Sequence, residues 1–199
     1  MMNRVVCVDA DGVLVDFLRV WSQAMQDVLG KSMPLLRNQY PLADRYGLQP
    51  YELDAVWHHF NTQNLWESLP EMPGAVEAIR LLREHDYQVN VVTMIEPEIL
   101  PARLNNFEAI GMPMVPVHVC SGTKEHILRK LGAVAHFDDN PAHINEALEA
   151  GVEARMHVVN HVGDLSPSAA TGRHHCLLNA VNDFILTFQD KRGMTVSFE

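Results

Sequence analysis

The stretch RVVCVDADGVL at positions 4–14 decides the fold. Its apolar part, residues 5–8, is the uninterrupted run typical of a strand buried on both faces of a parallel sheet. Asp9 and Asp11 follow at once, and Gly12 turns the chain. Because ligands of open α/β sheets bind at the carboxyl ends of the strands, we expect both carboxylates to lie in a functional site. Taken alone, the pattern fits an ordinary Asp-Gly turn equally well.

Further apolar, β-branched runs predict more strands, and helical patterns lie between them. The strands are expected at residues 88–93, 115–120, 134–138 and 154–159. The helices are expected from Pro73, over 101–110, from a cap at Thr123 to 131, over 140–151 and along the apolar stripe of 177–188. Strand alternating with helix predicts an α/β fold, a Rossmann-like core of three layers around a five-stranded parallel sheet.

The segment between residues 20 and 69 interrupts this alternation, because it holds helical stripes and no strand pattern. One stripe covers residues 21–29, and Pro50 opens another that includes Trp57 and Phe60. We therefore expect a core of residues 1–17 and 72–199 with a helical cap inserted at 18–71. The hinges of this cap are expected near 14–18 and 70–74.

Polar side chains also follow other predicted strands. Thr93 ends the second strand, Lys124 opens a helix after the third, and Asp138 and Asp139 end the fourth. Singly, these are ordinary residues of a strand, a solvated helix start and a capping turn. Together they place a hydroxyl group, an ammonium group with backbone N–H groups, and a second acid pair at one edge of the sheet. That combination predicts a site for phosphate and a metal ion.

These positions resemble the four motifs of the haloacid dehalogenase-like hydrolase superfamily. In that superfamily the dehalogenases lack the second aspartate and the phosphatases use it as acid and base, so Asp11 favours phosphate chemistry. The resemblance implies a phosphorylated Asp9, with Lys124, Thr93 and the backbone at Gly12 holding the phosphate oxygens. It also implies Mg²⁺ bound by the set Asp9, Asp11 (through its carbonyl) and Asp138, with Asp139 as a further contact or a replacement ligand.

Two segments are similar to the 5′(3′)-deoxyribonucleotidases, which remove phosphate from nucleoside monophosphates. They are residues 9–17 and 64–78. Met94 occupies the substrate-site position where that family has a serine, so one hydroxyl contact to the phosphate is absent. Phe17 and Trp66 match the cap edge that faces the site, where they either contact the substrate or pack the cap core.

Composition limits the partners and the compartment. The formal charge is −10 and no basic run occurs, which argues against a nucleic-acid polymer or an anionic membrane as partner and leaves a small phosphorylated substrate. Three widely spaced cysteines, no signal peptide and no membrane-length apolar run favour a cytoplasmic protein. A homodimer is compatible with the sequence.

Three other functions remain open at this point. A phosphatase for another small metabolite, such as a sugar phosphate, differs only in the cap. A phosphotransferase passes the phosphoryl group from Asp9 to an acceptor alcohol. A non-catalytic regulator that binds phosphate or metal is disfavoured, because Asp9, Asp11, Lys124 and Asp138 are all intact.

Overall fold

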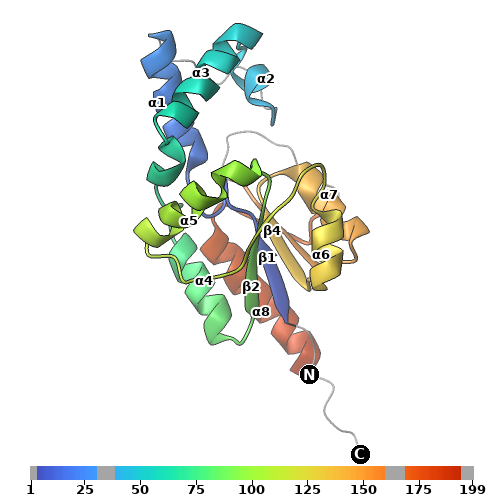
Figure 1. Cartoon of the computed structure of the whole chain (residues 1–199). Coiled ribbons are helices and arrows are strands. Elements are labelled where there is room, and N and C mark those ends of the chain that lie inside the picture. Colours follow the sequence, from blue (N-terminus) through green and yellow to red (C-terminus); the bar gives the residue numbers. More distant parts are fainter. Residues whose placement is uncertain (1–3, 31–38, 160–168, 194–199) are drawn as a thin grey trace, which may run out of the picture.

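The computed structural model describes residues 4–30, 39–159 and 169–193 (Figure 1). Within these residues a six-stranded sheet forms the centre of the molecule. Its strands are β1 (Val5–Val8), β2 (Gln88–Thr93), β3 (Val117–Val119), β4 (Ala135–Asp138), β5 (Ala154–Val158) and β6 (Gly172–His174). They lie in the order β3-β2-β1-β4-β5-β6, and all neighbours run parallel. The α/β class is confirmed.

The sixth strand corrects the expectation of five. β6 has three residues and joins the edge of the sheet, where Met156 pairs with Gly172 and Val158 with His174. Its sequence, Gly-Arg-His, has no apolar or β-branched residue, so periodicity alone could not reveal it. The backbone bond from Thr171 N to Arg155 O (2.8 Å) begins the pairing. β6 therefore forms through its pairing with β5, and His174 Nε2, 3.0 Å from Asp183 Oδ2, connects it to α8 (Leu177–Gly193).

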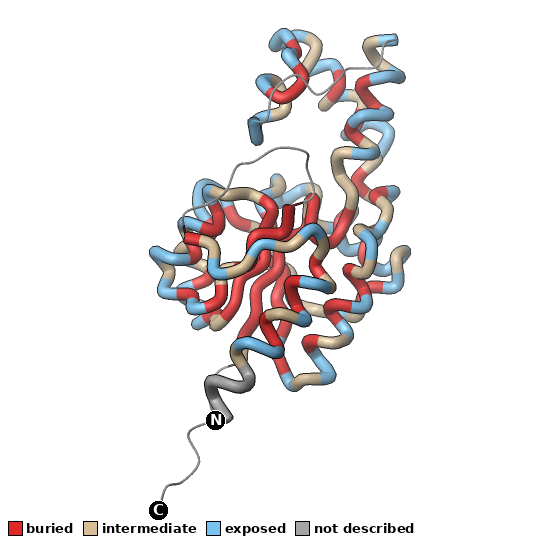
Figure 2. The backbone as a smooth tube through the Cα atoms, turned by 180° about the vertical axis from the view of Figure 1, so that it is seen from behind, coloured by how far each residue is buried: buried red, intermediate tan, exposed pale blue. Residues whose placement is uncertain are grey.

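Helices cover both faces of the sheet. They are α4 (Ala75–Glu84), α5 (Leu100–Ala109), α6 (Glu125–Leu131), α7 (Pro141–Glu149) and α8 (Leu177–Gly193), with a 3₁₀ turn η2 (Pro97–Ile99) before α5. Alternate β1 side chains enter opposite layers: Val6 and Val8 pack with α4 and α8, while Val5 and Cys7 pack with α6 and α7. Figure 2 shows the buried strands between these helical layers.

A group of helices stands over the carboxyl ends of the strands (Figure 1). It consists of α1 (Phe17–Leu29), α2 (Leu42–Tyr46), α3 (Pro50–Thr62) and the 3₁₀ turn η1 (Leu65–Ser68). Asp16 caps α1 by accepting from Arg19 N (3.1 Å), and Gln49 with Glu52 forms a capping box at α3. The five residues of α2 are too short to give a periodic signal, so the sequence did not mark them as a separate helix.

The two linkers of this inserted segment run side by side. Val15 and Glu71 form an antiparallel bridge, and Asp16 N donates to Pro70 O at 2.8 Å. Met72 N donates to Leu14 O at 2.9 Å. α1 begins at Phe17, next to the predicted boundary of core and cap, and the division itself stays a prediction.

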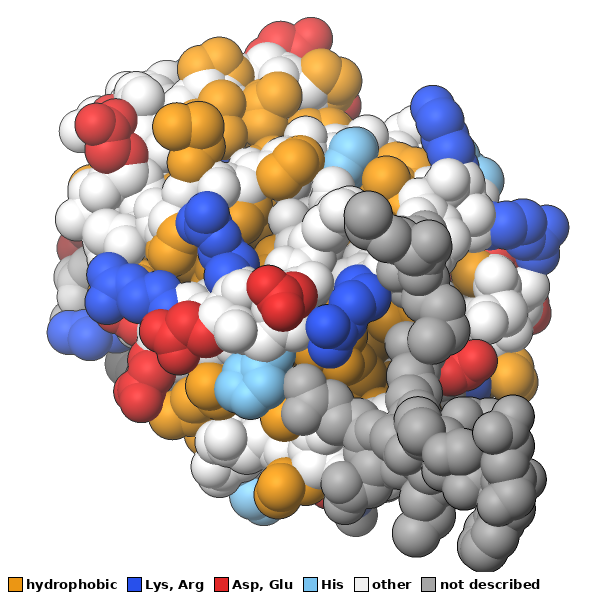
Figure 3. Space-filling view, turned by 90° about the horizontal axis from the view of Figure 1, so that it is seen from below, with side chains coloured by type: hydrophobic (Ala, Val, Ile, Leu, Met, Phe, Trp, Pro, Cys, Tyr) orange, Lys and Arg blue, Asp and Glu red, His pale blue; other side chains and the backbone are white. Residues whose placement is uncertain are grey.

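Acidic and basic side chains are interspersed on the face remote from the inserted helices (Figure 3). In the described parts of the chain, none of the helices combines the length and apolarity that a bilayer-spanning helix needs.

Candidate functional site

Three carboxylates meet where β1 and β4 end. Asp9 follows β1, Asp138 is the last residue of β4, and Asp139 comes next. Because β1 and β4 are neighbours in a parallel sheet, their carboxyl ends lie together. All three residues are buried, and each offers a carboxylate oxygen within 4.8 Å of the others. An all-oxygen set of this kind suits a hard cation such as Mg²⁺.

Lys124 bridges two of these carboxylates. Its Nζ donates to Asp9 Oδ1 at 2.6 Å and to Asp138 Oδ2 at 2.7 Å, and its side chain is fully buried. The expected cap at Thr123 is wrong, because Lys124 itself is the N-cap of α6. The Lys124 N–H donates to Glu146 Oε2 (2.8 Å), so this backbone donor is not open to an anion as expected. Lys124 therefore acts in the site through its ammonium group.

The charges of the cluster do not balance. Burial raises the pKa of Asp9 to about 7, although Lys124 opposes the shift. Burial also acts to raise the pKa of Asp138, but Lys124 and His143 outweigh it and hold that pKa well below its usual range. Burial acts to lower the pKa of Lys124. The negative charges of Asp138 and Asp9 outweigh burial, so the pKa of Lys124 is raised. One ammonium group thus faces three carboxylates, an arrangement that a bound cation relieves.

Two histidines fix the orientation of Asp138. His136 Nε2 lies 3.0 Å from Oδ2, and His143 Nδ1 lies 3.3 Å from Oδ1. Asn140 N also donates to Oδ1 at 2.8 Å. His136 is packed inside the protein, and His143 is also buried, at a position that the sequence did not foresee. These contacts hold the Asp138 carboxylate toward Lys124.

Asp11 has a separate partner on α5. Arg103 Nη2 donates to Asp11 Oδ1 at 2.6 Å, and the Arg103 side chain is fully buried. The Arg103 guanidinium lies over the Trp66 ring, with Cζ 5.4 Å from its centroid. Its Nε and Nη1 have no hydrogen-bond partner among the described residues. Sequence reasoning missed Arg103, since an arginine on a helix carries no signal that it turns inward.

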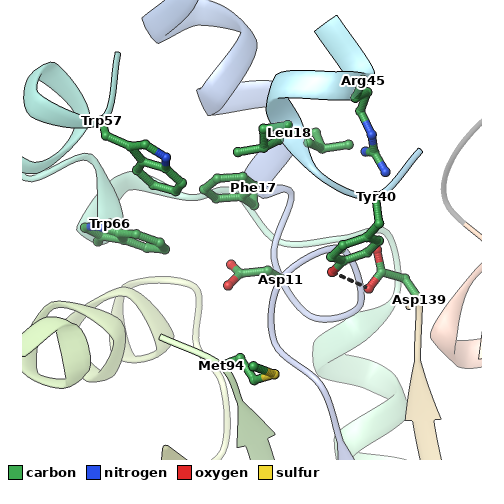
Figure 4. A pocket seen from close by; sticks show the side chains of 11 residues that line it. Asp11, Phe17, Leu18, Tyr40, Arg45, Trp57, Trp66, Met94 and Asp139 are labelled. Carbon is green, nitrogen blue, oxygen red and sulfur yellow. Dashed lines mark hydrogen bonds between the residues drawn. The ribbon is translucent and has the colours of Figure 1, made fainter. Parts of the chain in front are cut away.

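A cavity of about 210 Å³ lies above the carboxyl ends of the strands (Figure 4). Asp11, Gly12, Met94 and Asp139 contribute from the sheet side. The inserted segment contributes the remaining walls: Phe17, Leu18, Tyr40, Leu42, Arg45, Trp57 and Trp66. Four residues predicted to bind substrate, namely Gly12, Phe17, Trp66 and Met94, thus line the cavity. Thr93 ends β2 beside Met94 and is buried.

Phe17 and Trp66 also belong to the aromatic packing of the inserted helices. Their rings stack with centroids 5.7 Å apart and planes at 26°. Trp57 and Phe60 pack against both rings. Trp66 Nε1 donates to Asn61 Oδ1 at 2.9 Å, which fixes the indole. The two aromatic residues therefore stabilise the inserted helices and form a cavity wall at the same time.

A second cavity of about 780 Å³ adjoins the first, because both are lined by Trp57, Trp66 and Met94. Its other walls come from Asn61 and from the segments that follow β2 and β3. The exposed Met94 side chain therefore stands where the two cavities meet. The space available to a ligand continues past Met94 toward Cys120 and Gly122.

Several solved structures share this fold, among them three from bacteria. A Thermotoga maritima protein assigned as a β-phosphoglucomutase is 19% identical, with a TM-score of 0.66, over 94% of this chain and 100% of its own. A haloacid dehalogenase-like family hydrolase from Deinococcus radiodurans, solved with phosphate and sodium, is 17% identical, with a TM-score of 0.66, over 94% and 96%. A Pseudomonas syringae hydrolase is 14% identical, with a TM-score of 0.62, over 96% and 99%. At these identities the likeness establishes the fold.

The family assignment comes from the sequence itself. No curated protein matches the chain. Residues 3–164 match the model of the family described as 5′ nucleotidase, deoxy (pyrimidine), cytosolic type C protein. This match spans β1 to β5, the inserted helices and every residue of the acid cluster. The chain therefore belongs to this 5′-nucleotidase family, within the haloacid dehalogenase-like superfamily, and is a phosphatase that hydrolyses phosphomonoesters.

Proposed function

We propose that the protein hydrolyses a small phosphomonoester, a nucleoside monophosphate, by way of a phosphorylated Asp9. The observation that carries this proposal is the bridge of Lys124 Nζ between Asp9 (2.6 Å) and Asp138 (2.7 Å) at the carboxyl edge of the sheet. A buried ammonium group at this point can neutralise the charge of a transferring phosphoryl group. We also propose that the enzyme works in the cytoplasm.

The reaction takes two displacements. An Asp9 carboxylate oxygen attacks phosphorus, the bond from phosphorus to the ester oxygen breaks, and Asp11 gives that oxygen a proton. Water then attacks the phosphorus of the aspartyl phosphate while Asp11 accepts a proton from it. The bond between phosphorus and Asp9 breaks, which releases inorganic phosphate and restores both carboxyl groups. Arg103 keeps Asp11 apart from the acid cluster by holding its Oδ1.

Mg²⁺ fits the residues that are present. Asp9, Asp138 and Asp139 can each offer an oxygen, and the carbonyl of Asp11 is a further proposed ligand. When bound, the ion supplies positive charge against which the phosphoryl oxygens and the carboxylates can lie together. Lys124, Thr93 and the Asp11 N–H of the turn are proposed to hold the remaining oxygens, because the Gly12 N–H donates to Val15 O at 2.8 Å. Gly12 has φ of +79°, a conformation that brings the backbone close to a ligand without a side chain in the way.

The leaving group is proposed to occupy the cavity under the inserted helices. Its aromatic walls, Phe17, Trp57 and Trp66, suit a nucleobase or the apolar face of a sugar. The inserted segment would act as a cap that excludes water from the phosphorylated Asp9. Sugar phosphates stay an alternative substrate class, since Met94 replaces the family's serine.

The test is phosphate release from a panel of nucleoside, sugar and small-acid monophosphates, with Mg²⁺ and with chelator. We expect turnover of at least one nucleoside monophosphate in Mg²⁺ and none from Asp9→Asn, because removal of a nucleophile costs several orders of magnitude in rate. Retention of more than about a tenth of the activity by Asp9→Asn would rule out the aspartyl-phosphate route. Added acceptor alcohols show, by product analysis, whether the phosphoryl group is transferred to an alcohol.

A further inference from the structure

Arg45 is an almost fully buried arginine that lines the cavity from the inserted segment. It lies on α2 and is 4% exposed, and it contributes to the wall of the cavity that also holds Asp11 and Asp139. Its Nε donates to the backbone oxygen of Gln39 at 2.7 Å. Its guanidinium carbon lies 5.7 Å from the centroid of the Tyr40 ring. The backbone bond and the ring contact fix the side chain in position.

The charge of Arg45 has no carboxylate partner among the described residues. The two other cations around the site are both paired: Lys124 with Asp9 and Asp138, and Arg103 with Asp11. Arg45 has only a carbonyl oxygen and an aromatic ring. A buried charge without an opposite charge is costly, and a guanidinium group is shaped to hold carboxylate or phosphate oxygens in pairs. An anion bound in the cavity can therefore form an ion pair with the Arg45 guanidinium group.

Tyr40 separates Arg45 from the reacting groups. The Tyr40 hydroxyl group lies 3.4 Å from Asp139 Oδ1, at the acid cluster. Figure 4 shows Arg45 reaching down from α2 to the opposite end of the Tyr40 side chain. A phosphoryl group on Asp9 would lie on the Asp139 side of this ring, because Asp9 and Asp139 belong to one cluster. An anion at Arg45 would therefore belong to another part of the same ligand.

We propose that Arg45 binds a second anionic group, a phosphate or a carboxylate, where the leaving group carries one. This inference rests on the proposed function, because it assigns the other end of the substrate to the phosphate site at Asp9. It ranks doubly anionic phosphomonoesters, such as nucleoside bisphosphates, above nucleoside monophosphates, whose leaving group is uncharged. The aromatic walls between the two ends contact the intervening part of the molecule.

Binding can be measured without turnover in the Asp9→Asn background. Isothermal titration in Mg²⁺ compares thymidine 3′,5′-bisphosphate with thymidine 5′-monophosphate, and 2-phosphoglycolate with ethyl phosphate. The first pair tests a second phosphate and the second pair a carboxylate. We expect at least one doubly anionic ligand to bind about ten-fold or more tightly than its matched partner. Adding Arg45→Met should abolish this preference, and Arg45→Lys should restore part of it.

Arg19→Met is the matched control, because Arg19 is exposed on α1, in the same inserted segment, and is not among the residues of the cavity wall. It removes the same charge and should keep the preference. Equal affinity within both ligand pairs, absence of binding by all four ligands, or a preference that survives Arg45→Met would overturn the assignment. Phosphate release by the unsubstituted enzyme is measured separately. If the enzyme released no phosphate but still bound the doubly anionic ligand more tightly through Arg45, the result would count against the proposed hydrolysis and not against the anion site.

Discussion

Asp9 lies in a cluster of three carboxylates, and Lys124 is its ammonium partner. Its folded pKa of about 7 is above the ordinary value of 3.8, mainly through burial. Between pH 3.8 and about 7 the folded protein keeps a proton on Asp9 that the unfolded chain loses. The stabilisation that comes from this proton is complete below pH 3.8 and disappears as the pH rises through about 7. Asp9→Asn has no such carboxyl group. In chelator, we expect the melting temperature of this variant to exceed that of the unsubstituted protein by about 5 °C or more at pH 7.

Melting curves at several pH values between 4 and 7.5 test this expectation, and the difference should grow with pH. Asp54→Asn is the control, because Asp54 is exposed on α3. A constant difference across the range would show that Asp9 is ionised throughout.

The bond between Arg103 and Asp11 gives a second prediction at this scale. Arg103→Met should lower kcat for an alkyl phosphate about ten- to a hundred-fold, because Asp11 loses the group that orients it for proton transfer. An aryl phosphate, which leaves readily without a proton, should be affected less. Steady-state kinetics of Arg103→Met, Arg103→Lys, Asp11→Asn and the double variant Arg103→Met with Asp11→Asn test this prediction. Arg103→Lys should recover part of kcat, and Arg103→Met should add little to Asp11→Asn. Equal losses on both substrates and in both backgrounds would mean that Arg103 only stabilises the fold.

The sequence located the residues at strand ends, and it missed the arginines of α2 and α5 and the histidine of α7. Asp9, Asp11, Thr93, Asp138 and Asp139 were predictable, because parallel strands bring their carboxyl ends to one edge. Arg45 and Arg103 reach the cavity only through the packing of α2 and α5, which no local pattern encodes. His143 meets Asp138 because α7 begins directly beyond β4.

At the scale of elements, the buried parallel strands were the easiest to predict, since their apolar runs have no helical period. β6 and α2 are too short to show a period. β6 pairs with β5, and α2 packs its Tyr46 into the hydrophobic core, and neither contact can be read from a local pattern. The start of α6 was misplaced for a different reason. Thr123 is a good capping residue, but the chain places Lys124 at the cap, where its side chain reaches the carboxylates.

Gly74 joins the second linker to α4 and carries the third prediction. Its φ is +76°, and a Cβ atom there would lie 3.2 Å from Leu178 Cβ. Gly74→Ala should lower the free energy of unfolding by about 2–3 kcal/mol, through backbone strain and crowding against α8. Gly30→Ala is the matched control, because Gly30 has φ of +65° and open space around it. It should cost only about 1 kcal/mol, from the backbone alone. Denaturant unfolding measures both, and equal losses would exclude the contact with Leu178.

For the whole molecule, the acid cluster predicts coupling between metal binding and stability. At a hundred-fold excess over its Kd, Mg²⁺ should stabilise the protein by about 2.7 kcal/mol, or on the order of 5–10 °C in Tm. Asp138→Ala should lose most of this gain together with activity, because Asp138 is one of the three clustered carboxylates. Differential scanning fluorimetry with Mg²⁺ and with chelator provides the measurement. A full response in Asp138→Ala would place the ion elsewhere.

Because the two linkers are paired, we expect the inserted helices to be exchangeable as a unit. Asp16 and Pro70 lie next to the predicted boundaries of the cap, and Asp16 N donates to Pro70 O at 2.8 Å. A graft at these points would leave the register of every strand, and hence the acid cluster, untouched. We expect recombination at these two paired junctions to give the hydrolytic centre a new set of walls. We expect chimaeras joined at Asp16 and Pro70 to have altered specificity and to keep turnover when they retain Trp66, because Arg103, the partner of Asp11, lies over its ring.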